Sequence, residues 1–312
     1  MASHHAMTVT AHSGQVPAAA FGLAAFAVFS WGITPAITAF QVTEIPALQA
    51  GIMRSLFAVP AAVAFIVFLR LKTPSDRATW GWLLLAGFAA FCGFPILFTL
   101  GVSRTATSHA ALILACMPVV SGAMAAMLDR RMPRSGWFAG ATVALIGEAI
   151  LITSRDSTGV ATLEGDMLVI AAAVISGSGY VAGSRATAKI GTWSTTFWGI
   201  AIAGTAQVPL LVWIAHDFGW GELTWVGWSS TLYLVMFSTV LAYAAWYWAL
   251  NHGSVVRIAP IQFGQPVVSL VFAVVLLSEP ITLPIMVSTA LIIGGIVLAS
   301  RAQRTPQMQG GK

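Results

Sequence analysis

The side chains best suited to recognise a small molecule are amides and aromatic rings set within long apolar stretches. Gln262 and Gln265 are three residues apart, as are Tyr243 and Trp246, so on a helix each pair points to one face. An amide both donates and accepts hydrogen bonds, which suits the two ends of a zwitterion, and aromatic rings favour bulky or planar groups. Simple helix packing is the alternative interpretation. The candidate binding residues are Trp31, Phe94, Phe98, Met117, Tyr180, Tyr243, Trp246, Gln262 and Gln265.

Charged side chains are rare within the apolar stretches. Arg54 and Glu148 are the two that lie well inside, at matching depths from one predicted membrane face. We therefore predict an intramembrane ion pair between them, either structural or part of an outer gate. The alternatives are an Arg54 side chain that extends toward the interface and a protonated Glu148.

Two prolines occupy corresponding positions in the two halves of the chain. Pro118 and Pro266 each lie inside an apolar stretch, where proline removes a backbone hydrogen bond and bends a helix. Their matched placement makes both residues hinge candidates. Many membrane helices contain proline without any gating role, and this is the competing interpretation; Pro35, Pro95 and Pro209 are further candidates.

Catalytic and metal-binding patterns are missing from the sequence. There is no His-Glu-x-x-His motif, and His109 and His252 are predicted near opposite membrane faces. Cys92 and Cys116 lie deep in apolar stretches and are interpreted as small buried side chains. We expect no metal, no cofactor and no enzymatic activity, and an intramembrane enzyme is kept as the competing hypothesis.

Composition indicates that lipid is the solvent. Of 312 residues, 58% are hydrophobic and only 8% charged, whereas a soluble domain has about 25% charged residues. About 20 apolar residues cross a bilayer as a helix. The sequence therefore predicts an all-α membrane protein with ten transmembrane helices. The predicted spans are Ala18–Phe40, Ala47–Leu69, Trp80–Gly101, Thr107–Leu128, Ser135–Thr153, Gly165–Ser184, Trp193–Ala215, Val226–Leu250, Arg257–Leu277 and Thr282–Ala299.

The basic residues predict the orientation. With a cytoplasmic N-terminus, the outer loops hold only Arg104 and Arg155, and all the other predicted loop and tail cations lie inside. We predict a multi-pass protein of the bacterial inner membrane with two cytoplasmic tails, a disordered one at 1–17 and another at 301–312. The net charge of +5 is spread over short loops, so no nucleic-acid partner is expected. The sequence indicates no oligomeric state. The inner cations are Arg70, Lys72, Arg77, Arg130, Arg131, Arg134, Arg185, Lys189, Arg257, Arg301, Arg304 and Lys312.

The second half of the chain repeats features of the first. Residues 117–121 read Met-Pro-Val-Val-Ser and residues 265–269 read Gln-Pro-Val-Val-Ser. An Ile-Gly pair followed by Ser-Arg also occurs at the end of each half. Five helices per half make the two halves enter the membrane from opposite sides. We therefore predict two inverted repeats, at 18–153 and 165–300, an arrangement that lets one site face each side in turn.

The order of several short motifs resembles the drug/metabolite transporter superfamily, and in particular its two-repeat EamA members. The resemblance covers about residues 18–301, and the second-half motifs look most like the YddG-type amino-acid exporters. One departure lies after the fourth span, where Leu128-Asp129-Arg130 stands in place of the acidic pattern that ends at Glu279. The motifs are Ser30-Trp31-Gly32, Pro46 with Arg54, Pro118, Ala242-Tyr243-Ala244-Ala245-Trp246, Ala249-Leu250-Asn251-His252-Gly253, Pro266 and Leu277-Ser278-Glu279-Pro280.

This resemblance implies an alternating-access exporter of aromatic and other neutral amino acids, with xenobiotics as further substrates. It also implies that helices one, three, four, six, eight and nine line a central uncharged cavity. Because Glu148 is the only acid expected well inside a span, and lies off centre, we favour a uniporter over a proton-coupled multidrug or metabolite antiporter.

Overall fold

The computed structural model describes residues 17–130, 133–154, 161–216, 218–253 and 258–304, and within these ranges the regular structure is helical with no strand. Among the described residues, nine helical stretches of 19 to 28 residues are long and apolar enough to cross a membrane. A shorter apolar helix, Ile261–Leu277, corresponds to most of the ninth predicted span, whose first residue lies outside the described residues. These findings confirm the all-α membrane class. Residues 1–16 of the predicted tail at 1–17, and residues 305–312 of the other tail, also lie outside the described residues.

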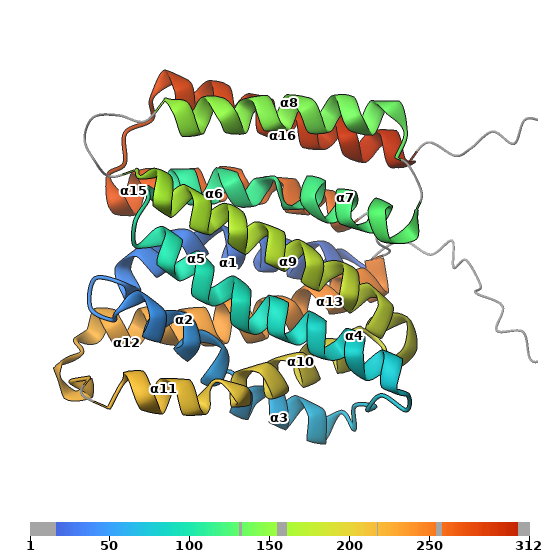
Figure 1. The fold of residues 1–312 in the computed structure, drawn as a ribbon, viewed down its shortest axis with the longest axis vertical. Coiled ribbons are helices and arrows are strands. Elements are labelled where there is room, and N and C mark those ends of the chain that lie inside the picture. The colour runs from blue at the N-terminus through green and yellow to red at the C-terminus, as the bar shows by residue number, and fades with distance from the viewer. Residues whose placement is uncertain (1–16, 131–132, 155–160, 217, 254–257, 305–312) are drawn as a thin grey trace, which may run out of the picture.

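Most spans are built from two or three helical segments in series (Figure 1). In chain order the helices are α1 (Ala18–Gln41), α2 (Ala47–Leu56), α3 (Val59–Phe68), α4 (Arg77–Phe88), η1 (Ala89–Gly93), α5 (Phe94–Val102), α6 (Thr107–Ala115), α7 (Met117–Asp129), α8 (Ser135–Thr153), α9 (Leu163–Ile190), α10 (Thr192–Ala206), α11 (Val208–Ile214), η2 (Trp220–Glu222), α12 (Trp225–Leu232), η3 (Tyr233–Leu241), α13 (Ala242–Gly253), η4 (Ala259–Gly264), α15 (Gln265–Leu277) and α16 (Leu283–Arg304).

Proline explains where many of these segments begin. Pro60, Pro118, Pro209 and Pro266 each occupy one of the first two positions of a segment, in α3, α7, α11 and α15. The missing N–H and the clash with the preceding turn stop a helix from running through such a residue. The third and eighth spans instead contain π-helical turns, η1 and η3. Each kind of interruption therefore recurs in corresponding spans of the two halves.

Two helices extend beyond their predicted ends. The sixth predicted span ends at Ser184, but α9 continues to Ile190, where Gly191 takes a positive φ of 83° and ends the helix. At the other end, the Thr162 hydroxyl accepts a hydrogen bond from the Gly165 N–H at 3.1 Å. The segment from 301 to 304, predicted as part of a tail, belongs to α16. The predicted spans were bounded by apolar residues, so polar residues at the ends of the helices were left out.

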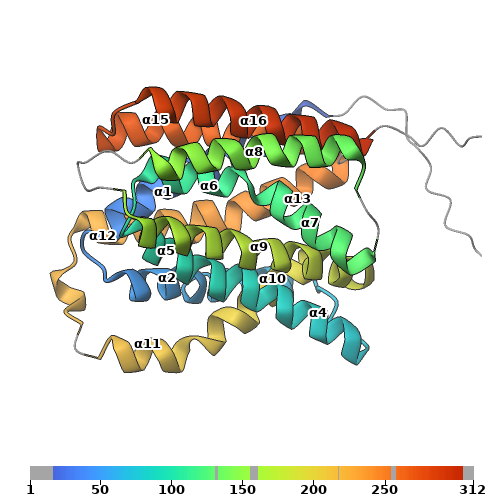
Figure 2. The same cartoon turned by 45° about the horizontal axis from the view of Figure 1, so that its top comes forward.

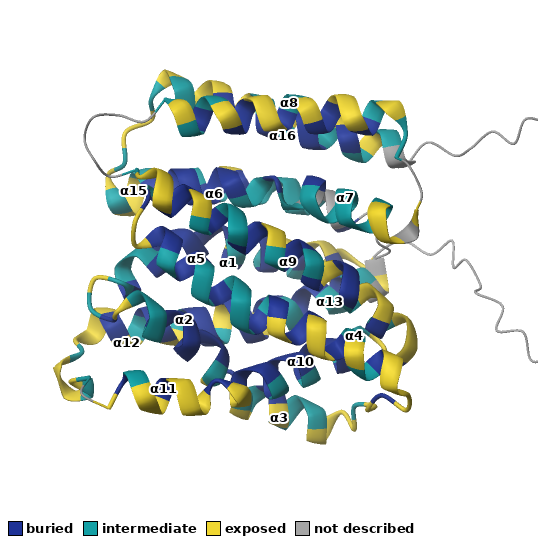
Figure 3. Ribbon diagram, viewed as in Figure 1, coloured by how far each residue is buried: buried dark blue, intermediate teal, exposed yellow. Residues whose placement is uncertain are grey.

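The helices α8 and α16 form an antiparallel pair along one edge of the bundle (Figures 1 and 2). They expose their outer side chains and bury the small residues between them (Figure 3). A Cβ atom on Gly140 would lie 2.3 Å from the Ala299 backbone nitrogen, and one on Gly295 would lie 2.5 Å from that of Ala144. The pair is held by close backbone approach, which only small residues allow.

The repeated Pro-Val-Val-Ser sequence makes the same contact twice. A Cβ on Gly32 of α1 would meet the Val268 side chain of α15, and a Cβ on Gly177 of α9 would meet the Val120 side chain of α7. Val120 and Val268 are equivalent positions of the two copies. More widely, α1 packs on α13 and α15, while α9 packs on α4, α5 and α7. Exchanging the two halves therefore maps this set of helix contacts onto itself.

Loop carboxylates bind the first turns of helices from distant parts of the chain. Glu44 accepts hydrogen bonds from the Thr224 N–H at 2.9 Å, the Gly227 N–H at 3.2 Å and the Thr224 hydroxyl, at the start of α12. Glu279 accepts from the N–H groups of Thr107 at 2.6 Å and Ser108 at 2.9 Å, at the start of α6. Negative charge is favourable at a helix N-terminus, so both contacts tie loops to spans.

Replacing Gly295 by alanine is expected to lower the free energy of unfolding by about 1–3 kcal/mol, because the added methyl group overlaps the α8 backbone. The matched control is Gly294→Ala, where a Cβ meets nothing within 4 Å and helix propensity favours alanine by up to about 1 kcal/mol. Thermal unfolding of the detergent-purified variants measures both. Equal behaviour of the two variants would show that α8 and α16 are not closely packed.

The Glu44 contact also predicts a pH dependence. The hydrogen bond from the Thr224 side chain, with those from the Thr224 and Gly227 backbone, lowers the pKa of Glu44 below its ordinary value. A lowered folded-state pKa stabilises the fold above the unfolded pKa of about 4.3, and this stabilisation is lost as the pH falls through the folded pKa. Glu44→Gln should therefore lower the melting temperature at pH 7 but not at pH 3. Glu164→Gln, which removes an exposed pairing with Arg104 at 3.2 Å, is the control and should have little effect at either pH.

Candidate functional site

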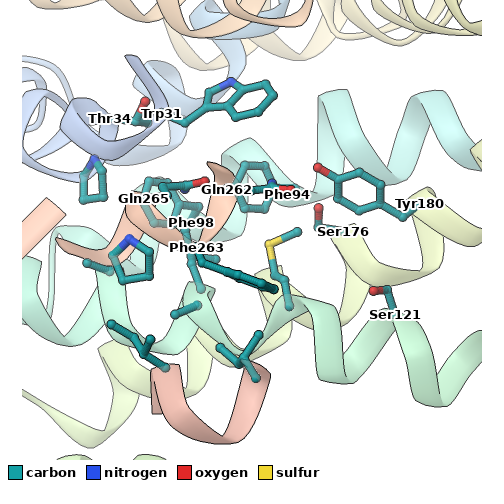
Figure 4. A pocket seen from close by; sticks show the side chains of 18 of the residues that line it. Trp31, Thr34, Phe94, Phe98, Ser121, Ser176, Tyr180, Gln262, Phe263 and Gln265 are labelled. Atoms are coloured by element: carbon teal, nitrogen blue, oxygen red, sulfur yellow. The ribbon is translucent and has the colours of Figure 1, made fainter. Parts of the chain in front are cut away.

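A cavity of about 290 Å³ lies in the interior of the bundle, close to the lower end of the range of about 300–1,000 Å³ seen for small-molecule pockets. Figure 4 shows Trp31 and Thr34 of α1, Phe94 and Phe98 of α5, Ser176 and Tyr180 of α9, and Gln262 of η4 around it. The remaining lining residues are Pro35, Arg54, Ala111, Leu114, Ala115, Met117, Ser121, Tyr243, Phe263, Gln265, Pro266, Ile293 and Ile296.

All the candidate binding residues predicted from the sequence line this cavity, with the exception of Trp246. That side chain is only 7% exposed and packs behind Trp31, with ring centroids 5.6 Å apart, in a cluster between α1 and α13. Tyr243 and Trp246 are three residues apart, but only the tyrosine reaches the cavity. Helices one, three, four, six, eight and nine all contribute to the lining, as the family resemblance implied. Arg54 from helix two and two isoleucines from helix ten contribute as well.

The aromatic wall has defined ring geometry. The Trp31 and Tyr243 rings meet edge to face with centroids 5.2 Å apart, and Phe94 stacks on Phe98 at 5.4 Å with 14° between the planes. Such pairs prefer these geometries because of the charge distribution of the rings. The Trp31 indole N–H donates to the Ser238 carbonyl at 2.9 Å, which fixes the ring that faces the cavity.

The hydroxyl group of Ser238, in the π-helical segment η3, connects three helices. The Arg54 Nη2 donates to it at 3.0 Å, and the Thr34 hydroxyl lies 2.7 Å away. The Thr34 hydroxyl also lies 3.0 Å from the Ser30 carbonyl, to which it donates, so the Ser238 hydroxyl donates to Thr34. The Arg54 Nε donates to the Thr239 hydroxyl at 3.1 Å. Ser238 and Thr239 were not predicted as site residues, because two hydroxyl side chains in an apolar span do not indicate which groups they contact.

The predicted ion pair between Arg54 and Glu148 is not formed. Arg54 binds the two hydroxyl groups of η3, while Glu148 on α8 accepts a hydrogen bond from the Cys116 thiol at 3.4 Å. Both side chains are buried, but they face different neighbours. Two residues at the same depth in different spans need not be in contact, because depth does not determine how each helix is rotated about its own axis.

A second buried acid lies near the predicted outer face. Asp166 has no exposed surface; its carboxylate oxygens lie 3.3 Å from His109 Nδ1, and the Thr105 hydroxyl donates to it at 2.5 Å. His109 lines a separate cleft of about 710 Å³, together with Arg104 and Glu279. Asp166 is the second residue of the predicted span Gly165–Ser184, and Glu148 was the only acid predicted well inside a span. A polar residue one turn inside a helix end was the available signal.

The hinge candidates lie where their spans are interrupted. Pro266 lines the cavity and follows the 3-10 helix η4, and Pro118 follows the break between α6 and α7 at Cys116. The residues before them, Met117 and Gln265, both line the cavity. The geometry required of a hinge is therefore present, and hinge motion stays a prediction.

A multi-pass bundle of interrupted helices around one internal cavity is the architecture of many membrane transporters. The EamA-like transporter family matches residues 19–153 and again residues 163–301. The chain therefore belongs to the EamA-like transporter family, as the resemblance of its motifs indicated, and it has two EamA repeats.

Similar proteins are transporters by name. The uncharacterized transporter YdeK of Bacillus subtilis is 25% identical over 81% of this chain and 86% of its own length. A probable amino-acid metabolite efflux pump of Salmonella typhimurium is 25% identical over 92% and 98%. A probable terminal-alkyne amino-acid exporter of Streptantibioticus cattleyicolor is 25% identical over 70% and 72%. One crystal structure shares the fold, with a TM-score of 0.63 and 19% identity over 92% of this chain and 98% of that chain.

Removing the Ser238 hydroxyl tests its role as the connection between helices. Ser238→Ala leaves Arg54 and Thr34 each short of a buried partner, so the free energy of unfolding should fall by about 1–3 kcal/mol. Ser55→Ala is the matched control: its buried hydroxyl has no hydrogen-bond partner among the described residues, and its loss should be neutral. The melting temperatures of the two purified variants measure this difference. A Ser238→Ala variant as stable as the wild type would contradict the role of this hydroxyl in connecting the helices.

Proposed function

We propose that the protein exports aromatic and other neutral amino acids, and some xenobiotics, across the bacterial inner membrane. The observation that carries the proposal is the cavity, where aromatic rings and the amides of Gln262 and Gln265 surround one space. Rings stack on bulky side chains, and amides bind polar groups without adding net charge to the membrane interior. The names of two relatives, a probable amino-acid metabolite efflux pump and a probable terminal-alkyne amino-acid exporter, support the same substrate class.

Alternating access between two inverted repeats is the proposed mechanism. It is supported by the equivalent contacts Gly32 to Val268 and Gly177 to Val120, and by the recurrence of each helix interruption in corresponding spans. The basic loops support a cytoplasmic position for both termini. The run from Ala242 to Trp246 and its order with the other motifs support a YddG-type exporter within the family.

We propose transport without proton coupling. No Asp or Glu of the described residues lines the cavity, so protons and substrate do not share a binding group there. The preference for a uniporter also rested on Glu148 as the only acid expected well inside a span. Asp166 is buried too, which weakens that reason. The contact between His109 and Asp166 favours the proton-coupled antiporter as the second candidate, since such pairs often mark proton pathways. An intramembrane enzyme has no comparable observation in its favour.

Uptake of labelled phenylalanine into proteoliposomes tests this proposal. We expect saturable transport, with an affinity about tenfold lower in Trp31→Ala, because a stacking surface is lost. The control is Trp213→Ala, which removes a ring that is 75% exposed at the surface of the bundle and should leave uptake unchanged. Linear, unsaturable uptake would indicate a channel. Accumulation driven by an imposed proton gradient would reject the uniporter in favour of the antiporter.

A further inference from the structure

We propose that Arg54 is the anchor for the carboxylate of the transported molecule, so that the cavity selects organic carboxylates. This inference rests on the proposed function and adds a charge requirement to it. The cavity predicted from the sequence was uncharged, whereas the lining of the observed cavity includes Arg54.

The guanidinium of Arg54 has no negative partner among the described residues. The side chain is 7% exposed, and the contacts of Arg104 with Glu164 and of His109 with Asp166 do not involve it. No acidic residue of the described lining shares the cavity. Among the described residues, the Arg54 side chain donates hydrogen bonds to the neutral hydroxyls of Ser238 and Thr239. A buried charge without a counter-ion is unfavourable, so the site favours an anionic ligand.

The unused donors of Arg54 suit a carboxylate. Guanidinium carries five N–H donors in one plane, and the hydroxyl contacts use Nε and one N–H of Nη2. Nη1 is buried and has no partner among the described residues. One N–H of Nη1 and the second N–H of Nη2 therefore remain side by side along the end of the guanidinium, and such a parallel pair of donors can bind both oxygens of a carboxylate.

The hydroxyl contacts also fix the direction of this edge. Thr239 donates its own proton to the Leu234 carbonyl at 2.8 Å, and Ser238 donates to Thr34, so both hydroxyls can only accept from Arg54. They hold one side of the guanidinium against η3 without neutralising it. A side chain held in this way is positioned before the ligand arrives, which reduces the entropy lost on binding.

The amino group of an amino acid meets a different environment. The polar lining groups besides Arg54 are neutral, among them the amides of Gln262 and Gln265 and the hydroxyls of Ser176 and Tyr180. They can accept hydrogen bonds from an ammonium group, but they supply no opposite charge. The carboxylate is therefore the required group and the amine is secondary.

Four probes with one aromatic ring separate these requirements: phenylalanine, phenylalaninamide, 3-phenylpropionate and phenethylamine. We expect the two carboxylates to bind the purified full-length protein at least about tenfold more tightly than the two amines, measured by calorimetry in detergent, because hydrogen bonds to charged groups contribute this much. Arg54→Gln should remove this preference and leave binding of the amines unchanged. Arg54→Lys should keep part of it, since the charge remains but the fork is lost.

The wild-type comparison needs no variant, so the proposal stays open to refutation if Arg54→Gln fails to fold. Equal binding of phenylalanine and its amide overturns the anchor and leaves the amino-acid exporter intact. Binding of 3-phenylpropionate without phenylalanine supports the anchor and overturns the amino-acid substrate. An equal loss for all four probes in Arg54→Gln shows that Arg54 only connects α2 to η3, and no binding of any probe to the wild type overturns both proposals.

Discussion

Lipid offers no hydrogen-bond partner, so every interruption of a membrane helix needs a partner from within the protein. The two π-helical segments show how this chain meets the requirement. In η1, the Phe91 carbonyl accepts from the Gln207 amide at 3.0 Å, and in η3 the Ser238 carbonyl accepts from the Trp31 indole at 2.9 Å. In each π-helical segment, a backbone carbonyl therefore accepts a hydrogen bond from a side chain of another span. Broken helices and interhelical hydrogen bonds are two consequences of one constraint.

The same constraint governs where charge can lie. Arg54 is bound by hydroxyls that come from the interrupted helix, and Glu148 by a thiol, so neither charged side chain faces lipid. Asp166 is placed beside His109, at the end of the bundle where Glu279 holds the first turn of α6. Glu148, Asp166 and Glu279 each bind partners other than Arg54, so the cation in the cavity wall stands apart from these acids. This separation leaves the charge of Arg54 available to a ligand.

Much of the architecture could be predicted from the sequence, because spans depend on length and hydrophobicity alone. The Pro-Val-Val-Ser repeat also carried real information, since Val120 and Val268 make equivalent contacts. The predictions that were wrong concerned the rotation of helices about their axes and the partners of individual side chains. Trp246 lies behind the cavity wall, although its spacing from Tyr243 placed both on one face of a helix.

The same limit applies to polar pairs. Arg54 and Glu148 share a depth but face different helices, and Ser238 became important only because η3 brings it to the arginine. Hydrophobicity reports how deep a residue lies. It does not report which way the residue points, and a site depends on direction.

The two halves are related but their ends are not equivalent. The helices α7 and α15 both end in a left-handed residue, Arg130 and Ser278, with the same displacement along the chain as Pro118 and Pro266. The motifs align Glu279 with Arg130, and this displacement aligns it with Arg131, which lies outside the described residues; both are cations.

A carboxylate binds the positive end of a helix, as Glu279 does at α6, whereas a cation at that place is repelled by it. The departure from the family pattern after the fourth span therefore has a physical meaning. Exchange of the two halves, which the proposed alternating access involves, does not reproduce the contact of Glu279, because the counterpart positions in the sequence carry cations. The two exchanged conformations therefore differ in this stabilising contact, and we expect the resting orientation of the proposed carrier to depend in part on which half carries the acid.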